Sequence, residues 1–102
     1  MNAQFKKGVV EMCILKLISL RDMYGLEVIE GISKEIDVNE NTVYPILRRL
    51  TVAGYFETYK EKNESGPDRK YYKVTSEGMM YLKDLVEEYQ EFTSRVERII
   101  GE

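Results

Sequence analysis

Few residue types in this chain could do covalent or metal chemistry. Histidine is absent, and cysteine occurs once, at Cys13. Nucleophile–base pairs that need histidine, and zinc or iron–sulfur sites that need several cysteines or histidines, are therefore excluded. The seven glycines are scattered and form no phosphate-binding loop. An enzyme that uses only carboxylates or lysines stays open in principle, but we expect a binding protein without cofactor or metal.

The side chains best suited to binding lie on one predicted helix, at residues 40–53. Helical spacing predicts that its core face consists of Val43, Ile46, Leu47 and Leu50. The opposite face presents polar groups and is flanked by Thr42, Arg49 and Tyr44, with Asn41, Pro45 and Arg48 at its centre. Arginine can bond guanine through two donors, asparagine can read adenine, and threonine or tyrosine can reach phosphates. These residue types suit DNA, but they are common on any exposed helix.

The start of this helix is ambiguous in the sequence. Asn39 is a good N-cap, and Glu40 suits the first helical turn. Pro45 lacks an N–H group and disfavours helical geometry at Tyr44. The helix either starts near Thr42, or starts at Asn39 and bends at Pro45, and we favour Asn39.

The elements around this helix follow from periodicity and composition. Apolar spacing predicts helices near 4–20 and 24–36. After Gly54, residues typical of strands occupy 55–61 and 70–74, joined by a loop at 62–69. Three helices followed by a hairpin is the order of a winged helix-turn-helix, a mostly α fold with a β-hairpin (α+β). In such proteins the second helix of the motif enters the DNA major groove, and here that is the helix at 40–53.

A last helix is predicted after Thr75, which can cap it. Its apolar side chains follow a heptad seam: Leu82, Leu85, Tyr89, Phe92, Val96 and Ile99. A helix of ~26 residues is about 39 Å long, which exceeds what a core of this size covers. The helix either folds back on its own domain or packs on a partner chain, and we favour a homodimer. We expect residues 1–74 to form the DNA-binding part and residues 75–102 the dimerisation helix, in one compact domain overall.

Charge is distributed unevenly along the chain, whose formal net charge is −3. Residues 75–102 carry seven acids and three bases, whereas residues 1–74 carry eleven acids and twelve bases. Basic residues gather on the helix at 40–53 and on the hairpin: Arg48, Arg49, Lys60, Lys62, Arg69, Lys70 and Lys73. Five acids lie among them, so this is a modest nucleic-acid signal that predicts weak, salt-dependent non-specific binding. A solvated surface explains the charges equally well.

Three segments of the sequence resemble PadR-like transcriptional regulators. They are Met23-Tyr24-Gly25-Leu26-Glu27-Val28, then Asn41-Thr42-Val43-Tyr44-Pro45-Ile46-Leu47-Arg48-Arg49-Leu50 with Gly54, and Gly66-Pro67-Asp68-Arg69-Lys70-Tyr71-Tyr72-Lys73-Val74-Thr75 with Gly78. The length resembles the short subgroup, whose single C-terminal helix makes the dimer. The resemblance implies a cytoplasmic, homodimeric DNA-binding regulator, usually a repressor, that responds to small and often aromatic compounds.

The predicted function is therefore that of a dimeric winged-helix regulator of double-stranded DNA, a repressor relieved by a small molecule. We expect the DNA-binding residues to be Asn39, Asn41, Thr42, Tyr44, Pro45, Arg48, Arg49, Lys60, Lys62, Arg69 and Lys70. A flat hydrophobic effector could lie among apolar side chains of the first and last helices: Phe5, Val9, Met12, Tyr89 and Phe92. Alternatively, these side chains simply fill the interface.

Two further expectations concern the rival function and the compartment. The rival is a winged-helix protein-interaction module without specific DNA binding. Unpaired Arg48 and Arg49 would favour DNA, whereas pairing with Glu40 or Glu57 would favour the rival. No apolar run approaches the ~20 residues of a membrane span, no signal peptide precedes the charged start, and the lone cysteine suits a reducing cytoplasm.

Overall fold

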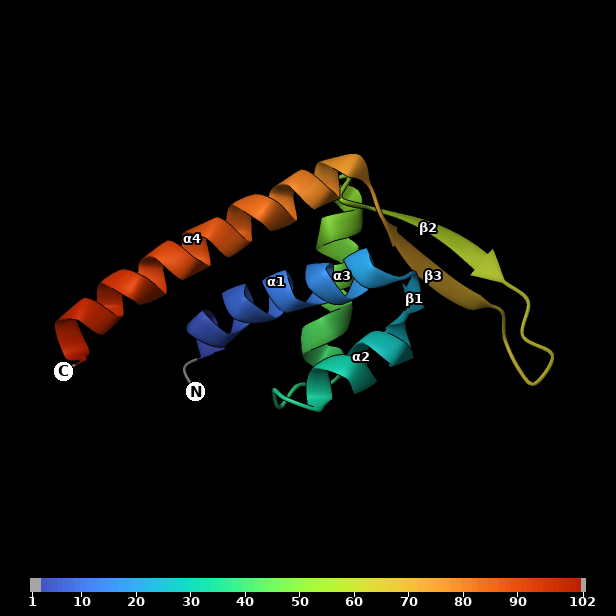
Figure 1. Cartoon of the computed structure of the whole chain (residues 1–102). Coiled ribbons are helices and arrows are strands. Elements are labelled where there is room, and N and C mark those ends of the chain that lie inside the picture. Colours follow the sequence, from blue (N-terminus) through green and yellow to red (C-terminus); the bar gives the residue numbers. More distant parts are fainter. Residues whose placement is uncertain (1–2, 102) are drawn as a thin grey trace.

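The order of elements is that of a winged helix with an added long helix. The computed structural model describes the backbone of residues 3–101 and the side chains of residues 8–101. Helices α1 (Ala3–Leu20), α2 (Gly25–Ser33) and α3 (Glu40–Val52) precede the hairpin of β2 (Phe56–Glu61) and β3 (Arg69–Val74). Helix α4 (Ser76–Ile100) follows, and Figure 1 shows it running alongside α1 and extending away from the hairpin. The predicted fold class is confirmed.

The core lies where α1, α2 and α3 meet the sheet and the first turns of α4. The predicted core face of α3 is confirmed, because all four of its apolar side chains are buried: Val43, Ile46, Leu47 and Leu50. They pack with buried side chains of α1 and with Phe56, Tyr72 and Leu82. A buried apolar face of this kind stabilises α3 far more than helix propensity does.

A short strand, β1 (Met23–Tyr24), replaces the predicted start of the second helix at residue 24. Met23 pairs with Tyr72 and Tyr24 with Tyr71, so β1 joins the hairpin in a three-stranded antiparallel sheet of order β1-β3-β2. The prediction was wrong here because this extended backbone is stabilised by pairing with residues almost fifty positions away. The predicted end at residue 36 was also wrong: α2 ends at Ser33, and the chain turns so that Val38 reaches the core.

The start of α4 is anchored to the end of α3. Thr75 caps α4, as predicted: its Oγ1 accepts a hydrogen bond from Gly78 N at 3.0 Å and donates one to Gly54 O at 2.7 Å. Thr75 N also donates to Tyr55 O at 3.0 Å. Gly54 has a φ of +87°, a left-handed conformation that glycine adopts without strain. These bonds set the direction in which α4 leaves the domain.

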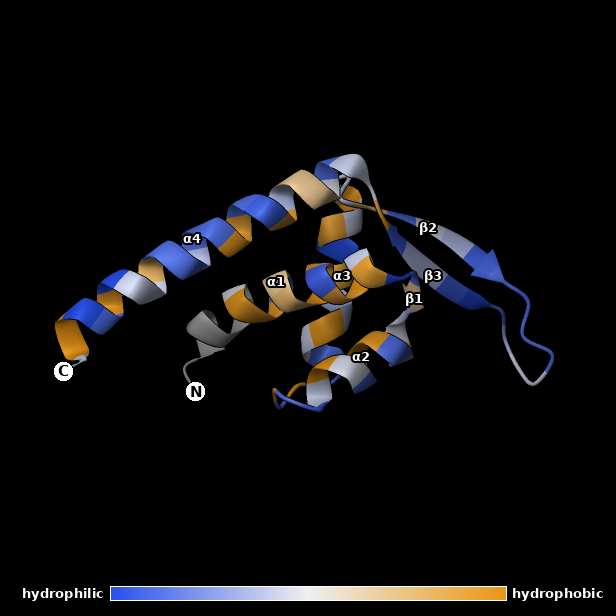
Figure 2. Cartoon of the chain, viewed as in Figure 1, coloured by the Kyte–Doolittle hydropathy of each residue, from blue (hydrophilic) through white to orange (hydrophobic). Residues whose placement is uncertain are grey.

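Helix α4 leaves its own core about halfway along its length. Leu82 is buried and Leu85 half-buried, but Tyr89, Phe92 and Ile99 are 40%, 58% and 82% exposed, and Val96 is half-buried. Figure 2 shows hydrophobic residues recurring along α4 to its C-terminal end. The helix therefore folds back on its own domain only over its first part, and most of the seam stays uncovered. No helix in residues 3–101 combines the length and apolar character needed to cross a bilayer.

Candidate nucleic-acid interface

The exposed face of α3 begins at a well-formed N-cap. Asn39 has extended backbone angles, and its Oδ1 accepts a hydrogen bond from Asn41 N at 2.9 Å. The helix proper starts at Glu40, as favoured from the sequence, and Pro45 lies inside it. Because Asn39 is occupied as the cap, the first side chains of α3 that project freely are Glu40 and Asn41.

The predicted DNA-facing side chains of α3 lie on its solvent side. Asn41, Pro45 and Arg48 are exposed, and Thr42 is half-buried. Tyr44 is 38% exposed, and its ring lies against Gly25, so closely that a Cβ atom at Gly25 would overlap the ring. Gly25 thus lets α2 and α3 approach each other and sets the position of Tyr44. The Tyr24-Gly25 motif was the available signal for this contact.

A cleft of about 340 Å³ separates α3 from the hairpin, and it is lined by two cations. Its walls are Tyr44, Arg48, Thr51, Val52, Lys70 and Tyr72. Lys70 Nζ lies 5.6 Å from the centre of the Tyr72 ring, and Lys60 is paired with Lys70 across the strands on the same face. No carboxylate lines this cleft, and among the described side chains Arg48 has no ion-pair partner. The cleft can therefore attract a phosphate group.

Arg49 has a different environment from its neighbour Arg48. Its Nη2 lies 2.8 Å from Glu11 Oε1 on α1, and the Glu11 side chain is only 14% exposed. Neither arginine is paired with Glu40 or Glu57. The structure therefore does not bring Arg49 to the cleft, and its partner is an acid 38 residues away that helical spacing on α3 could not reveal.

The hairpin separates its charges between two faces. Cross-strand pairing places Glu57 opposite Lys73 and Glu61 opposite Arg69, on the face turned away from Tyr72 and the core. Lys60 and Lys70 occupy the inner face. Arg69 and Lys70, expected together at the wing, leave the strand on opposite faces because side chains alternate along a strand. At the edge of the sheet, however, both line one hollow with Tyr44 and Asp68. Lys62 is exposed in the hairpin loop.

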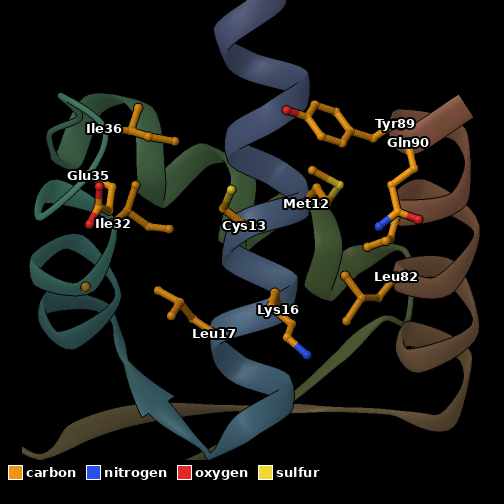
Figure 3. Close-up of a pocket in the computed structure, with 12 residues that line it drawn as sticks. Met12, Cys13, Lys16, Leu17, Ile32, Glu35, Ile36, Leu82, Tyr89 and Gln90 are labelled. Carbon is orange, nitrogen blue, oxygen red and sulfur yellow. The ribbon is translucent and has the colours of Figure 1, made fainter. Parts of the chain in front are cut away.

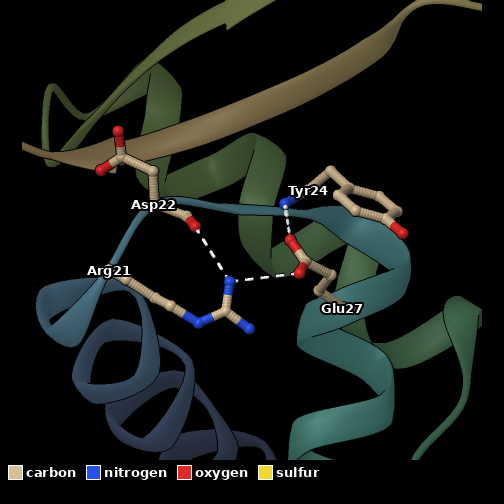
Figure 4. A network of polar contacts seen from close by, with 4 residues as sticks. All are labelled: Arg21, Asp22, Tyr24 and Glu27. Carbon is tan, nitrogen blue, oxygen red and sulfur yellow. Dashed lines mark hydrogen bonds and ion pairs between the residues drawn. The ribbon is translucent and has the colours of Figure 1, made fainter. Parts of the chain in front are cut away.

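The outer face of the sheet carries aromatic and polar contacts near the start of α2. Tyr59 Oη donates to Asp22 Oδ2 at 2.6 Å, and Tyr24 N donates to Glu27 Oε1 at 3.2 Å. Glu27 also pairs with Arg21 at 3.1 Å, and Figure 4 shows Arg21, Asp22, Tyr24 and Glu27 around the link between α1 and α2. Sequence reasoning singled out the segment that contains Tyr24 and Glu27 at the start of the second helix, but it did not predict these contacts.

The bond to Asp22 predicts a pH-dependent contribution of Tyr59 to stability. It raises the Tyr59 pKa to about 12, mainly because the neutral hydroxyl donates to the carboxylate. Folding therefore favours the protonated form, so the contribution is complete below pH 10 and is lost as pH rises from about 10 to 12. Tyr59→Phe should abolish it. In a titration followed by tyrosinate absorbance, wild type should contain one tyrosine that ionises at a higher pH than the others, and Tyr59→Phe should lack it. Identical absorbance curves at the alkaline end of the titration would contradict the assignment.

A groove of about 550 Å³ runs along α1 between α2 and α4. Figure 3 shows α1 as its floor, with Met12, Cys13, Lys16 and Leu17, and the two other helices as its walls. The Cys13 thiol is half-buried, and burial raises its pKa, so it is a poor nucleophile. Most of the remaining lining is apolar: Ile32, Ile36, Leu82, Val86 and Tyr89.

The residues proposed for an effector lie beside this groove. A neighbouring hollow of about 340 Å³ between α1 and α4 is lined by Val9, Met12, Tyr89 and Phe92, among others. The structure thus brings these four predicted residues together. The Phe5 side chain lies outside the part of the chain whose side chains are described.

A family model and several solved structures are similar to this chain and describe the same kind of protein. Residues 14–84 match a family described as "Transcriptional regulator PadR-like family". An uncharacterized protein of Lysinibacillus sphaericus is 36% identical over 89 residues, which are 83% of this chain and 82% of that protein. A PadR-like transcriptional regulator of Bacillus cereus is 30% identical with a TM-score of 0.86, covering 98% of this chain and 99% of that one. A PadR-like transcription factor of Bacteroides fragilis is 32% identical with a TM-score of 0.81, covering 95% of both chains.

Proposed function

Because this chain belongs to the PadR-like family of DNA-binding transcriptional regulators, we propose that it is a homodimeric repressor that binds operator DNA through α3 and the β2–β3 hairpin. The observation that carries the DNA-binding surface is the cleft between α3 and the hairpin. It holds Arg48 and Lys70, no carboxylate, and no ion pair to Arg48 among the described side chains. An uncompensated basic cleft beside an exposed helix is the electrostatic footprint of a nucleic-acid site.

In this proposal the two sides of the cleft have different roles. Helix α3 enters the major groove with its N-terminal part, and Arg48 reads a guanine edge through its paired N–H donors. Lys60 and Lys70, on the inner face of the hairpin, bind backbone phosphates. The acidic residues concentrated on α4 lie on a helix that extends away from the hairpin (Figure 1), so the net charge of −3 does not describe the local field at this surface.

We further propose that α4 forms the dimer with a second copy of the chain. The uncovered side chains of the seam, Phe92, Val96 and Ile99, would pack against the second copy's α4 and the apolar groove along its α1. Covering this surface removes apolar area from water, at about 25 cal/mol per Å². The pairing also fixes the distance between the two α3 helices, and we expect operator half-sites roughly 34 Å apart, one turn of DNA.

An effector would act by altering that distance. A flat apolar molecule in the hollow between α1 and α4, beside Tyr89 and Phe92, would change how the two copies pack. Ligand and DNA would then weaken each other by the same factor, because the coupling is reciprocal. Calorimetric titration with planar aromatic compounds should show lower affinity when operator DNA is bound, and equal affinity with and without DNA would exclude this route to derepression.

The test of the DNA surface is the Arg48→Ala variant. Fluorescence anisotropy would measure its binding to the promoter region of its own operon and to random DNA, at several salt concentrations. We expect a loss of about 1–3 kcal/mol on the operator and a relaxed sequence preference, because a base contact is lost. Unchanged affinity and preference would contradict the assignment of Arg48.

Arg49→Ala is the matched control. It removes the same side chain one position along α3, but Arg49 is bound to Glu11 on α1. We expect it to affect the unfolding transition and to leave sequence preference intact. If wild-type protein shows neither operator preference nor salt-dependent binding, the protein-interaction module is the better interpretation.

A further inference from the structure

Three tyrosines form an aromatic cluster on the outer face of the sheet, and the proposed DNA contacts do not use them. The cluster consists of Tyr24 on β1, Tyr59 on β2 and Tyr71 on β3. Tyr59 and Tyr71 are stacked, with centroids 5.5 Å apart and planes 9° apart, and Tyr24 meets Tyr71 edge to face at 5.4 Å. The cluster therefore connects the hairpin to the start of α2.

Arg69 ends this row of rings. Its Cζ lies 4.6 Å from the centre of the Tyr24 ring, a distance at which the guanidinium is attracted by the ring face. Glu61 stands opposite Arg69 in the ladder, but no ion pair to Arg69 occurs among the described side chains. A guanidinium that lies over a ring keeps the N–H donors at its edge available for a planar or tetrahedral anion.

Tyr24 itself is held by several independent contacts. It is paired with Tyr71 in the sheet, and its N–H donates to Glu27 Oε1 on the first turn of α2. Glu27 is in turn paired with Arg21 at the end of α1. The Tyr24 ring is thus fixed relative to the helical core that also carries α3, whereas Arg69 belongs to the hairpin.

We propose that Tyr24 is a positioning residue for Arg69: its ring holds the guanidinium at the loop end of the hairpin so that the side chain meets a DNA phosphate already ordered. This rests on the proposed function. A free arginine side chain loses rotamer freedom when it binds, and a preorganised one loses less. The ring also fixes the position of Arg69 relative to α3. The phosphate contact of the hairpin and the base contacts of α3 therefore keep a constant spacing along the duplex.

The test is a double-mutant cycle on DNA binding. Arg69→Ala should weaken specific and non-specific binding alike and lower the slope of log affinity against log salt by about one per monomer, so about two per dimer. Tyr24→Leu should weaken both kinds of binding about two- to fivefold per contact, the range that an exposed cation–π contact supplies. In an Arg69→Ala background, Tyr24→Leu should have no further effect.

Conservative variants separate positioning from a general structural role. Tyr24→Phe retains a ring and should bind DNA like wild type. Arg69→Lys retains the charge but loses the planar stacking group, so it should weaken binding although it leaves Tyr24 and the fold untouched. Tyr59→Leu is the matched control. It removes a ring of the same cluster, but Arg69 lies over the ring of Tyr24, so the slope of log affinity against log salt should stay unchanged.

The outcomes distinguish this inference from the function on which it rests. Additive effects of Tyr24→Leu and Arg69→Ala, or a Tyr24→Phe variant as weak as Tyr24→Leu, would overturn the positioning role while wild type still binds its operator. If thermal melting shows that Tyr24→Leu does not fold, the Arg69→Lys variant provides the test. A DNA affinity of Arg69→Lys equal to that of wild type would also overturn the positioning role of Tyr24. Failure of wild-type protein to bind DNA would instead remove the proposed function.

Discussion

Replacing both Phe92 and Val96 with Asp is expected to convert the proposed homodimer into folded monomers. In the isolated chain Phe92 is 58% exposed and Val96 half-buried, so the carboxylates enter no core of their own subunit. In a dimer the same positions would lie in an apolar seam, where an unpaired charge is strongly unfavourable. The wild-type sedimentation mass should be twice 12.0 kDa, and that of the double variant close to 12.0 kDa.

Met80→Asp is the control for this experiment. Met80 is a 70% exposed apolar residue of α4 that lies off the heptad seam, so a charge there should leave the dimer intact. The double variant should also lose most of its operator affinity, because two linked half-site contacts become independent. A wild-type mass near 12 kDa at micromolar concentration would refute dimerisation through α4.

Gly78→Ala is expected to cause the largest loss of stability of any glycine-to-alanine change among the described residues. A Cβ atom at Gly78 would collide with the backbone oxygen of Tyr55 and come within 2.8 Å of Val74 Cγ2. A backbone oxygen cannot move aside as a side-chain end can, so the first turn of α4 must shift. That shift strains the Thr75 hydrogen bonds to Gly54 O and from Gly78 N.

The expected magnitude is about 3 kcal/mol, the upper part of the range for overpacking, out of a typical total of about 5–15 kcal/mol. Urea unfolding at one fixed protein concentration would measure it as a lower midpoint with an unchanged slope. Gly8→Ala is the matched control, since no atom lies within 4 Å of the added Cβ on α1. That control should stabilise the helix by up to about 1 kcal/mol, and equal stability of both variants would show that the Gly78 contact is unimportant.

Local chemistry explains which parts of this protein could be predicted. The caps Asn39 and Thr75 act through hydrogen bonds within three residues, so the starts of α3 and α4 could be predicted from the sequence. The apolar period of α3 identified its core face, and therefore also placed Arg48 on the solvent side. The heptad spacing of α4 likewise identified Tyr89, Phe92 and Ile99, which its own domain leaves uncovered, but it also included Leu82, which the domain buries.

The tertiary structure decided the contacts between residues far apart in the chain. Strand β1 exists only because β3 lies beside it, and Arg49 is withdrawn from the cleft because folding brings Glu11 within 2.8 Å. The hairpin sorts the acids and bases of its two strands, which are mixed along the sequence, and leaves its inner face with Lys60 and Lys70 and without a carboxylate. Sequence alone determined the four helices and the hairpin, because caps and periodicity act over a few residues. Only the folded chain decided which charges remain uncompensated, because electrostatic pairing depends on distance in space and not on separation along the chain.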